Sequence, residues 1–256
     1  MIISASRRTD IPAYFGEKFY KDLQKGSFTI INPFNNKKKT IFFKKNEIDG
    51  IVFWTKNPYP FFNIVKKIKE DGYKFYFHYT LNNYPSSLEP LRFNLKTRID
   101  HLNNLFEIIY PYKIFWRYDP IILNDSFSIN FHVESFELIL YHIHPFIDKI
   151  VVSYLTIYRK IKKFFNKIIE DKNIQIELLR KLSEISGKFN KKIYICCYKE
   201  NLTNFNIFPS KCIDASYFGL NGKKHSGQRP LCNCDKSIDI GFYGTCKTNC
   251  LYCYAK

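Results

Sequence analysis

The sequence predicts an α/β fold, specifically a partly or fully closed (β/α) barrel of about seven parallel strands, and three observations support this. Apolar and aromatic runs of strand length alternate with helical stretches along the 256 residues. Several runs are almost continuously apolar, as strands of a buried parallel sheet are. Polar residues cluster where the runs end, which is where parallel barrels carry their active sites. The order strand, helix, strand favours right-handed βα units.

The expected strands and helices can be placed by their hydrophobic periodicity. Strands are expected at 2–6, 51–55, 74–81, 113–119, 149–155, 192–198 and 237–243. Helices are expected at about 15–25, 59–71, 90–109, 129–144 and 160–188. Gly72 and Gly187 are expected to end two of these helices. No low-complexity linker divides residues 1–256, so one domain is expected.

Composition narrows the class of protein. The chain opens without a basic and apolar leader, and no run approaches the ~20 apolar residues of a membrane span, so a cytoplasmic protein without a membrane partner is expected. The formal charge of +17 has two interpretations. It indicates either a polyanionic partner such as nucleic acid or a lysine-rich composition, because the lysines are spread along the chain. With eight cysteines and no export signal, metal ligation is favoured over disulfides.

Three cysteines lie in a Cys-x3-Cys-x2-Cys pattern: Cys246, Cys250 and Cys253. Structural zinc sites usually draw four ligands from closely spaced pairs. Three thiolates on one loop suit an iron–sulfur cubane better, because each binds one iron and the fourth iron stays open for another ligand. The spacing therefore favours a [4Fe–4S] cluster.

This pattern, with Tyr252 directly before the last cysteine, resembles the signature of the radical S-adenosylmethionine (SAM) superfamily. The resemblance implies a [4Fe–4S] cluster that binds SAM at its open iron. It also implies an electron donor such as flavodoxin or ferredoxin. In that superfamily the reduced cluster cleaves SAM to a 5′-deoxyadenosyl radical, which is chemistry beyond amino-acid side chains.

Longer segments extend the resemblance to a TIM-like barrel family. SIDIGFYGTCKTNCLYCYA (237–255), FWTKNP (53–58), HYTLNNYPSSLEPLRFNLKTRID (78–100) and WRYDPII (116–122) are similar to the spore photoproduct lyase-like, or DNA repair photolyase, branch. With SASRRTDIPA (4–13), NPFN (32–35), CID (212–214) and QRPLCNC (228–234), they identify the chain as a member of the uncharacterised DUF1848 family. The cluster loop follows the last strand, not the first. A circular permutation accounts for this order if strand 237–243 lies beside strand 2–6.

Other cysteines form a candidate auxiliary metal site within 196–235, holding either a second [4Fe–4S] cluster or zinc. Its candidate ligands are Cys197, Cys212, Cys232 and Cys234. Strand alternation is expected to turn Cys196 away from Cys197, so that only one of the two reaches the site. The alternative is that Cys196 and Cys197 are small buried apolar residues.

Polar residues at the strand ends supply the remaining candidates. The candidate catalytic residues are Arg7, Arg8, Asp10, Lys56, His78, Arg117 and Asp119. The candidate cofactor-binding residues are Ser6, Arg7, Thr55, Asn57 and Thr80. An arginine fork suits the carboxylate of SAM, although Arg8 and Asp10 could instead form a structural cap. His78 and Thr80 share one strand face, as do Arg117 and Asp119, which could form an ion pair instead.

Glu89 is expected to start the helix at 90–109, where the helix dipole alone would account for its charge.

Taken together, the patterns favour a radical SAM enzyme whose substrate is unidentified and could be nucleic acid. The alternative is a non-catalytic, basic nucleic-acid-binding protein stabilised by zinc or an iron–sulfur cluster. That alternative accounts for the cysteines and the charge but leaves the polar strand ends unexplained.

Overall fold

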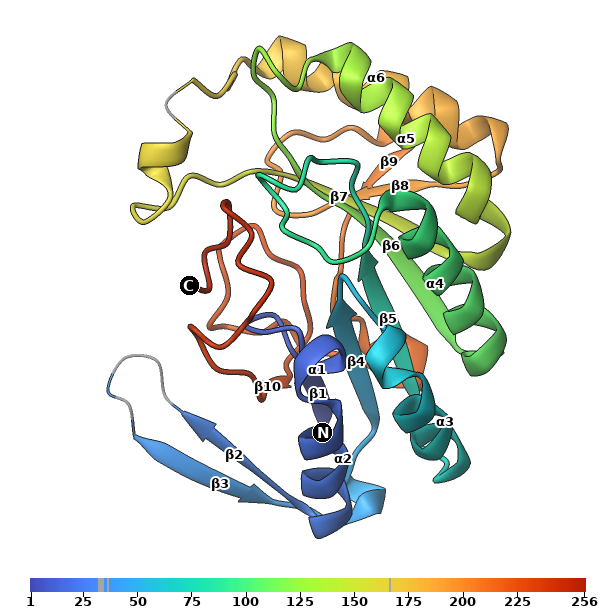
Figure 1. The fold of residues 1–256 in the computed structure, drawn as a ribbon, viewed down its shortest axis with the longest axis vertical. Helices are drawn as coiled ribbons and strands as arrows, with labels where there is room; N and C mark the ends of the chain where they lie inside the picture. The colour runs from blue at the N-terminus through green and yellow to red at the C-terminus, as the bar shows by residue number, and fades with distance from the viewer. Residues whose placement is uncertain (32–34, 36, 166) are drawn as a thin grey trace.

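A sheet of eight strands forms the centre of the computed structural model, which describes residues 1–31, 35, 37–165 and 167–256 (Figure 1). The NPFN segment (32–35) therefore falls almost entirely outside the described residues. The strands, in sheet order, are β10 (Ile238–Asp239), β1 (Ile2–Ala5), β4 (Gly50–Thr55), β5 (Phe75–Thr80), β6 (Lys113–Ile121), β7 (Lys149–Tyr154), β8 (Ile193–Ile195) and β9 (Ile207–Pro209). Every neighbouring pair is parallel, which confirms the predicted parallel α/β sheet.

All seven predicted strands are present, but two are much shorter than predicted. The strand predicted at 192–198 stops at Ile195, and the strand predicted at 237–243 is reduced to two residues. The short strand β9 was not predicted. In the described part of the chain, no hydrogen-bonded pairing joins β9 to β10, so backbone pairing does not close the barrel. An antiparallel hairpin, β2 (Ser27–Ile31) with β3 (Lys38–Phe42), was also missed and projects away from the sheet (Figure 1).

Five of the helices occupy the predicted regions with shifted boundaries, and the short helix α1 was not predicted. They are α1 (Ile11–Tyr14), α2 (Gly16–Lys25), α3 (Phe62–Glu70), α4 (Leu95–Ile109), α5 (Ile129–Ile143) and α6 (Lys172–Lys188). The prediction that helices begin at 90 and 160 was wrong. The side chains of Asn94 and Asp171 cap the helices there and so set later starts. Gly72, at φ +75°, does follow the end of α3, whereas Gly187 lies inside α6.

The two faces of the sheet are covered by different kinds of chain. Phe53, Phe77 and Trp116 lie on the face that packs against the helices. Their strand neighbours on the opposite face pack against residues 212–234, a segment that contains a short 3-10 helix and no α-helix. Figure 1 shows α3–α6 on one side of the sheet and the carboxyl-terminal loops on the other. We call the second side the inner face, and it carries the polar strand ends.

None of the helices in the described residues combines the length and the apolar character that a membrane crossing requires.

Two glycines provide a matched test of packing on the inner face. A Cβ at Gly50 would lie 2.2 Å from the ring of Phe218, whereas a Cβ at Gly187 would meet nothing within 4 Å. Gly50→Ala should lower the free energy of unfolding by about 1–3 kcal/mol through overpacking. Gly187→Ala should raise it by about 0.5–1 kcal/mol because alanine favours a helix interior. Urea unfolding measures both, and a Gly50→Ala protein as stable as the wild type would contradict the packing.

Candidate active site and cysteine clusters

The pairing of the last strand with the first places the cysteine loop beside residues 6–8. Ser4 of β1 pairs with Asp239 of β10, which confirms the predicted neighbourhood of these strands. The Asp239 carboxylate accepts hydrogen bonds from Ser4 Oγ at 2.9 Å, Ser6 Oγ at 2.6 Å and the Arg7 amide at 2.9 Å. Arg7 Nε lies 3.5 Å from the same carboxylate. Asp239 was missed in the sequence because its partners lie more than 230 residues away.

Arg8 and Asp10 have different roles. Arg8 lies at 5.1 Å over the ring of Tyr243 and stays partly exposed at the edge of the site. Asp10 caps α1 through the Ala13 amide at 3.0 Å and also accepts the Lys56 amide at 2.8 Å. Burial raises the pKa of Asp10 to about 6, although these hydrogen bonds oppose the shift. Both oxygens of Asp10 therefore serve the backbone, which supports the structural interpretation.

The turn after β4 positions Lys56. Thr55 Oγ1 accepts the Asn57 amide at 2.9 Å, and Asn57 Oδ1 accepts the Tyr59 amide at 3.3 Å. Thr55 and Asn57 thus shape the turn, while Lys56 extends its ammonium group to Glu89 Oε1 at 2.8 Å. Of these contacts, the one between Lys56 and Glu89 connects the turn to the cysteine loop, because Glu89 also binds Tyr252 of that loop.

Glu89 is a buried anion that ties the cysteine loop to the strand ends. Its carboxylate accepts hydrogen bonds from Lys56, from Asn82 Nδ2 at 2.9 Å and from the Tyr252 hydroxyl, and Arg98 Nη1 lies 3.6 Å away. Burial alone would raise the pKa of Glu89, but Lys56 and the hydrogen bonds outweigh it and lower that pKa. The expectation that Glu89 merely starts a helix was wrong, because α4 begins later, at Leu95.

The three cysteines of the loop differ in exposure. Cys250 is buried, whereas Cys246 and Cys253 are partly exposed. The Cys253 amide donates to the Cys250 carbonyl at 3.1 Å, and the Ala255 amide donates to Cys253 Sγ at 3.4 Å. A bond from the Leu251 amide to a neighbouring loop at residue 88 fixes the turn from outside. The loop is therefore ordered by backbone bonds, and two of its three cysteines are partly exposed.

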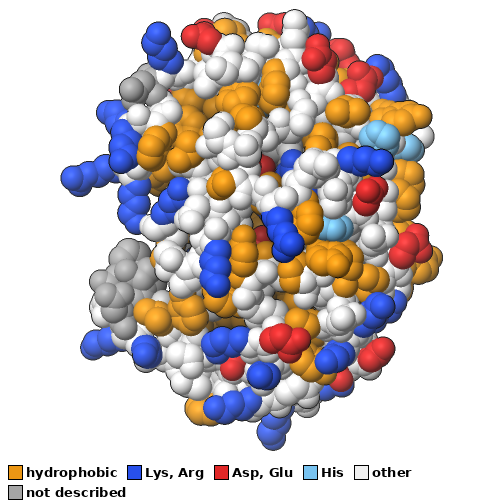
Figure 2. Space-filling view, in the orientation of Figure 1, with side chains coloured by type: hydrophobic (Ala, Val, Ile, Leu, Met, Phe, Trp, Pro, Cys, Tyr) orange, Lys and Arg blue, Asp and Glu red, His pale blue; other side chains and the backbone are white. Residues whose placement is uncertain are grey.

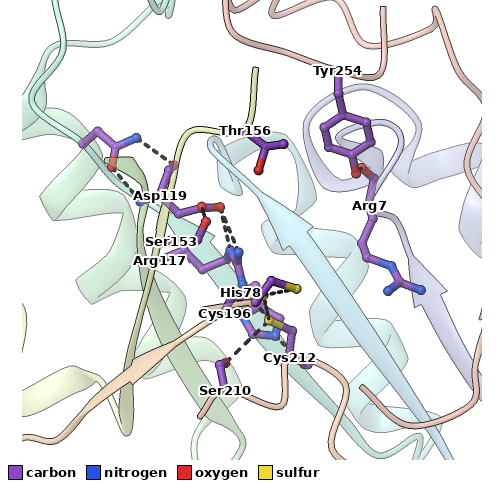
Figure 3. A network of polar contacts seen from close by, with 12 residues as sticks. Arg7, His78, Arg117, Asp119, Ser153, Thr156, Cys196, Ser210, Cys212 and Tyr254 are labelled. Carbon is purple, nitrogen blue, oxygen red and sulfur yellow. Dashed lines mark hydrogen bonds and ion pairs between the residues drawn. The ribbon is translucent and has the colours of Figure 1, made fainter. Parts of the chain in front are cut away.

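The predicted pairs on β5 and β6 lie on the inner face (Figure 3). Arg117 forms an ion pair with Asp119 at 2.8 Å and also donates to Cys212 Sγ at 3.1 Å. His78 Nε2 lies 2.6 Å from the Cys212 carbonyl oxygen, and among the described residues its Nδ1 has no partner although it is buried. Burial, helped by Arg117, lowers the pKa of His78 to about 3, so its ring is neutral. Thr80 lies next to Arg117 in register.

The remaining thiols meet on the same face. Cys196 Sγ lies 3.7 Å from Cys197 Sγ and 3.7 Å from Cys212 Sγ. The prediction that Cys196 and Cys197 point to opposite faces was wrong, because β8 ends at Ile195 and Cys197 adopts φ +53°. Cys232 interacts with Cys197 and with Cys234, and Cys234 also interacts with Cys212. Hydrogen bonds with Cys196 and Cys234 hold the pKa of Cys212 well below its usual range, against burial.

These five thiols (Cys196, Cys197, Cys212, Cys232 and Cys234) form what we call the thiol ring. Cys196 Sγ contacts Cys197 Sγ and Cys212 Sγ directly, and the other neighbours in the ring lie close enough to shift one another's pKa. Over the described ranges, no three His, Cys, Asp or Glu side chains are already arranged as a metal site, either in the ring or in the 246–253 loop.

Comparisons with known proteins identify a family without an assigned role. Residues 2–255 match the family described as a domain of unknown function, DUF1848. No curated protein matches the chain significantly. Among solved structures, a Bacteroides thetaiotaomicron protein provisionally described as an alpha-L-fucosidase is 11% identical, with 67% of this chain and 74% of that one covered and a TM-score of 0.34. At that TM-score the likeness supports no conclusion about this chain.

Replacing Asp239 tests the junction of β10 and β1. Asp239→Asn should lower the free energy of unfolding by about 2–4 kcal/mol, because an amide group would face hydrogen-bond donors in a buried site. The matched control is Asp22→Asn, which breaks only an exposed pair with Lys18 and should change stability by about 0–0.5 kcal/mol. Chemical unfolding of both proteins gives the comparison. Equal effects would contradict a central role for Asp239.

Glu89 predicts a pH dependence of stability. Its pKa is lower in the folded protein than in the unfolded chain, so ionised Glu89 stabilises the fold above about pH 4. That contribution is lost as the pH falls through the folded pKa. Glu89→Gln should therefore be clearly less stable than the wild type at pH 7, with the gap narrowing below about pH 4. Urea midpoints across this pH range measure the gap, and a gap that is constant with pH would refute the assignment.

Proposed function

This chain belongs to the DUF1848 family, and we propose that it is a radical SAM enzyme built on a partial (β/α) barrel. One observation carries the proposal. A loop with three thiols follows a strand that pairs with β1, and Glu89 links that loop to Lys56 and Asn82 at the ends of β4 and β5. The carboxyl ends of parallel strands are where such folds assemble ligand sites.

The donor set suits an iron–sulfur cluster. Cys246, Cys250 and Cys253 would hold it, since all three are soft thiol ligands from one loop and two of them are partly exposed. Lys56 lies near the thiols of Cys250 and Cys253, where its positive charge would offset the negative charge of thiolates. The hydrogen bond from the Ala255 amide to Cys253 Sγ is the type of contact that tunes the reduction potential of such clusters.

The cluster, when bound, would supply the one-electron reduction that cleaves SAM and begins radical chemistry. The chain's own residues would then bind and orient. Arg7, partly buried beside Asp239, and Arg8 at the edge of the site are cations suited to the SAM carboxylate. His78 is neutral, and its Nδ1, which has no partner among the described residues, offers an acceptor to an N–H or O–H group of a ligand. An electron donor of the flavodoxin or ferredoxin class would be the protein partner.

The non-catalytic nucleic-acid-binding alternative lacks a specific supporting observation. On the side of the molecule that Figure 2 shows, Lys and Arg side chains are scattered among apolar and acidic groups and do not form a stripe. Nucleic acid remains one candidate substrate within the enzyme proposal. The charge of +17 is compatible with it, but the geometry does not single it out.

The proposal is tested by iron content and SAM cleavage after anaerobic purification and reconstitution. The wild type should bind about four irons per chain in the 246–253 loop. A triple Cys246/Cys250/Cys253→Ala variant should lose them. Cys250→Ala alone should abolish SAM cleavage while its circular dichroism spectrum stays unchanged, because alanine fits the space of the thiol.

Cys197→Ser serves as the control, since it alters a thiol outside the loop and should keep the loop's iron. A Cys250→Ala protein that still cleaves SAM would refute the cluster assignment. So would a triple variant that retains its full iron content.

A further inference from the structure

The thiol ring lies on the inner face, and none of its five cysteines has a role in the function proposed above. We infer that Cys196, Cys212, Cys232 and Cys234 bind a single Zn²⁺ ion, which fastens the segment that covers this face. The inference stands independently of the radical SAM proposal, because it uses none of the cysteines of the 246–253 loop. It also narrows the two auxiliary centres that the sequence leaves open, a second [4Fe–4S] cluster or zinc, to one.

Three separate segments bring these thiols together. Cys196 directly follows β8, and its amide still donates to the Val152 carbonyl at 2.9 Å. Cys212 precedes a short 3-10 helix at Ala215–Phe218. Cys232 and Cys234 belong to the loop that leads to β10. Cys212, Cys232 and Cys234 are buried, so ligation would join distant parts of the chain inside the protein.

The sulfur spacing favours one ion over a cluster. Four thiolates at about 2.3 Å from a tetrahedral zinc ion lie about 3.8 Å from one another. Cys196 Sγ and Cys212 Sγ are already 3.7 Å apart. In a cubane, each thiolate binds a different iron on the outside of the cluster, so the sulfurs must stand much farther apart. A ring of closely spaced sulfurs can close on an ion by small movements, but it would have to open widely to hold a cubane.

The sulfurs of the ring lie close together but are not arranged around one metal position. In the described residues the ring members contact their neighbours and do not converge on one point. Sulfur–sulfur contacts join neighbours in the ring, and a metal ion would displace the protons that remain on these thiols. Zinc binding therefore needs proton release and a small inward shift of the four sulfurs, with the backbone left in place.

The surroundings of the ring suit a negatively charged site. A zinc ion with four thiolates carries a net charge of −2, which is costly in a protein interior unless cations lie nearby. Arg117 donates directly to Cys212 Sγ at 3.1 Å, and Arg229 lies within electrostatic reach of Cys197, Cys196 and Cys232. Lys149 lies within electrostatic reach of Cys212 and Cys234. These cations come from three different segments and converge on the ring.

The backbone around the ligands is already held in place. The Cys212 carbonyl accepts hydrogen bonds from the Tyr76 hydroxyl at 2.9 Å and from His78 at 2.6 Å. The Ile213 amide donates to Cys234 Sγ at 3.5 Å, a bond from backbone to sulfur that structural metal sites use to orient their ligands. These hydrogen bonds orient the backbone of the ligands in advance, so zinc would need only to draw the four sulfurs together.

Cys197 is the excluded fifth thiol. It lies beyond the end of β8 in a left-handed conformation, at φ +53°, whereas Cys196 still belongs to the β8–β7 ladder through its amide. Cys196 Sγ lies 3.7 Å from Cys212 Sγ, whereas Cys197 interacts with Cys196 and Cys232 from outside the ladder. Cys197 therefore provides a matched control one residue away from a ligand.

The test is the zinc content per chain, together with X-ray absorption at the zinc edge, on protein expressed without added metal. The wild type should contain about one zinc per chain bound by four sulfurs at about 2.3 Å. The Cys246/Cys250/Cys253→Ala variant should retain that zinc, which separates this inference from the function proposed above. Cys196→Ser and Cys234→Ser should lose most of the zinc, and Cys197→Ser should keep it.

Zinc absent from the wild type, or iron in the ring with iron–iron scattering in the triple variant, would overturn the inference. Retention of zinc by Cys196→Ser and its loss from Cys197→Ser would overturn the ligand assignment. If Cys234→Ser fails to fold, the absorption edge of the wild-type protein still decides the number and type of ligands.

Discussion

The parallel pairing of β10 with β1 is the interaction on which the arrangement of this protein depends. Only two residues of β10 take part, so the backbone pairing is small, and the carboxylate of Asp239 adds three hydrogen bonds and an ion pair with Arg7. By binding Ser4, Ser6 and the Arg7 amide together, Asp239 fixes the turn after β1 relative to the loop after β10. From the cysteine loop, Tyr252 then contacts Glu89, and Glu89 contacts Lys56 and Asn82 at the ends of β4 and β5.

The second constraint on the fold is that the inner face of the sheet must be covered. Helices cover one side of the sheet, and their apolar faces account for the burial of Phe53 and Trp116. The other side carries Arg117 and His78 and is covered by a segment that contains no α-helix. Irregular chain has few backbone bonds of its own to keep it in place, so cross-links by side chains matter more there. Cysteines concentrated in this segment fit that need.

The parallel sheet could be predicted from the sequence because its strands are nearly continuous apolar runs, and this signal is local. The errors arose where local signals compete. A polar cap at Asn94 or Asp171 overrides the apolar periodicity that extends before it. Alternation placed Cys196 and Cys197 apart, but alternation holds only while a strand continues, and β8 ends first. Asp239 and Glu89 could not be identified as central, because their partners become neighbours only in the folded chain.

The order of the strands along the chain has a consequence for biosynthesis. Ser4 and Asp239 are 235 residues apart, so β1 is made first and its partner emerges from the ribosome after all the other strands of the sheet. Until then, β1 is an edge strand whose outer hydrogen-bonding groups are free to pair with other chains. The nascent protein therefore passes through a stage with an unprotected sheet edge. Delivery of any cofactor to the 246–253 loop must wait until that stage ends.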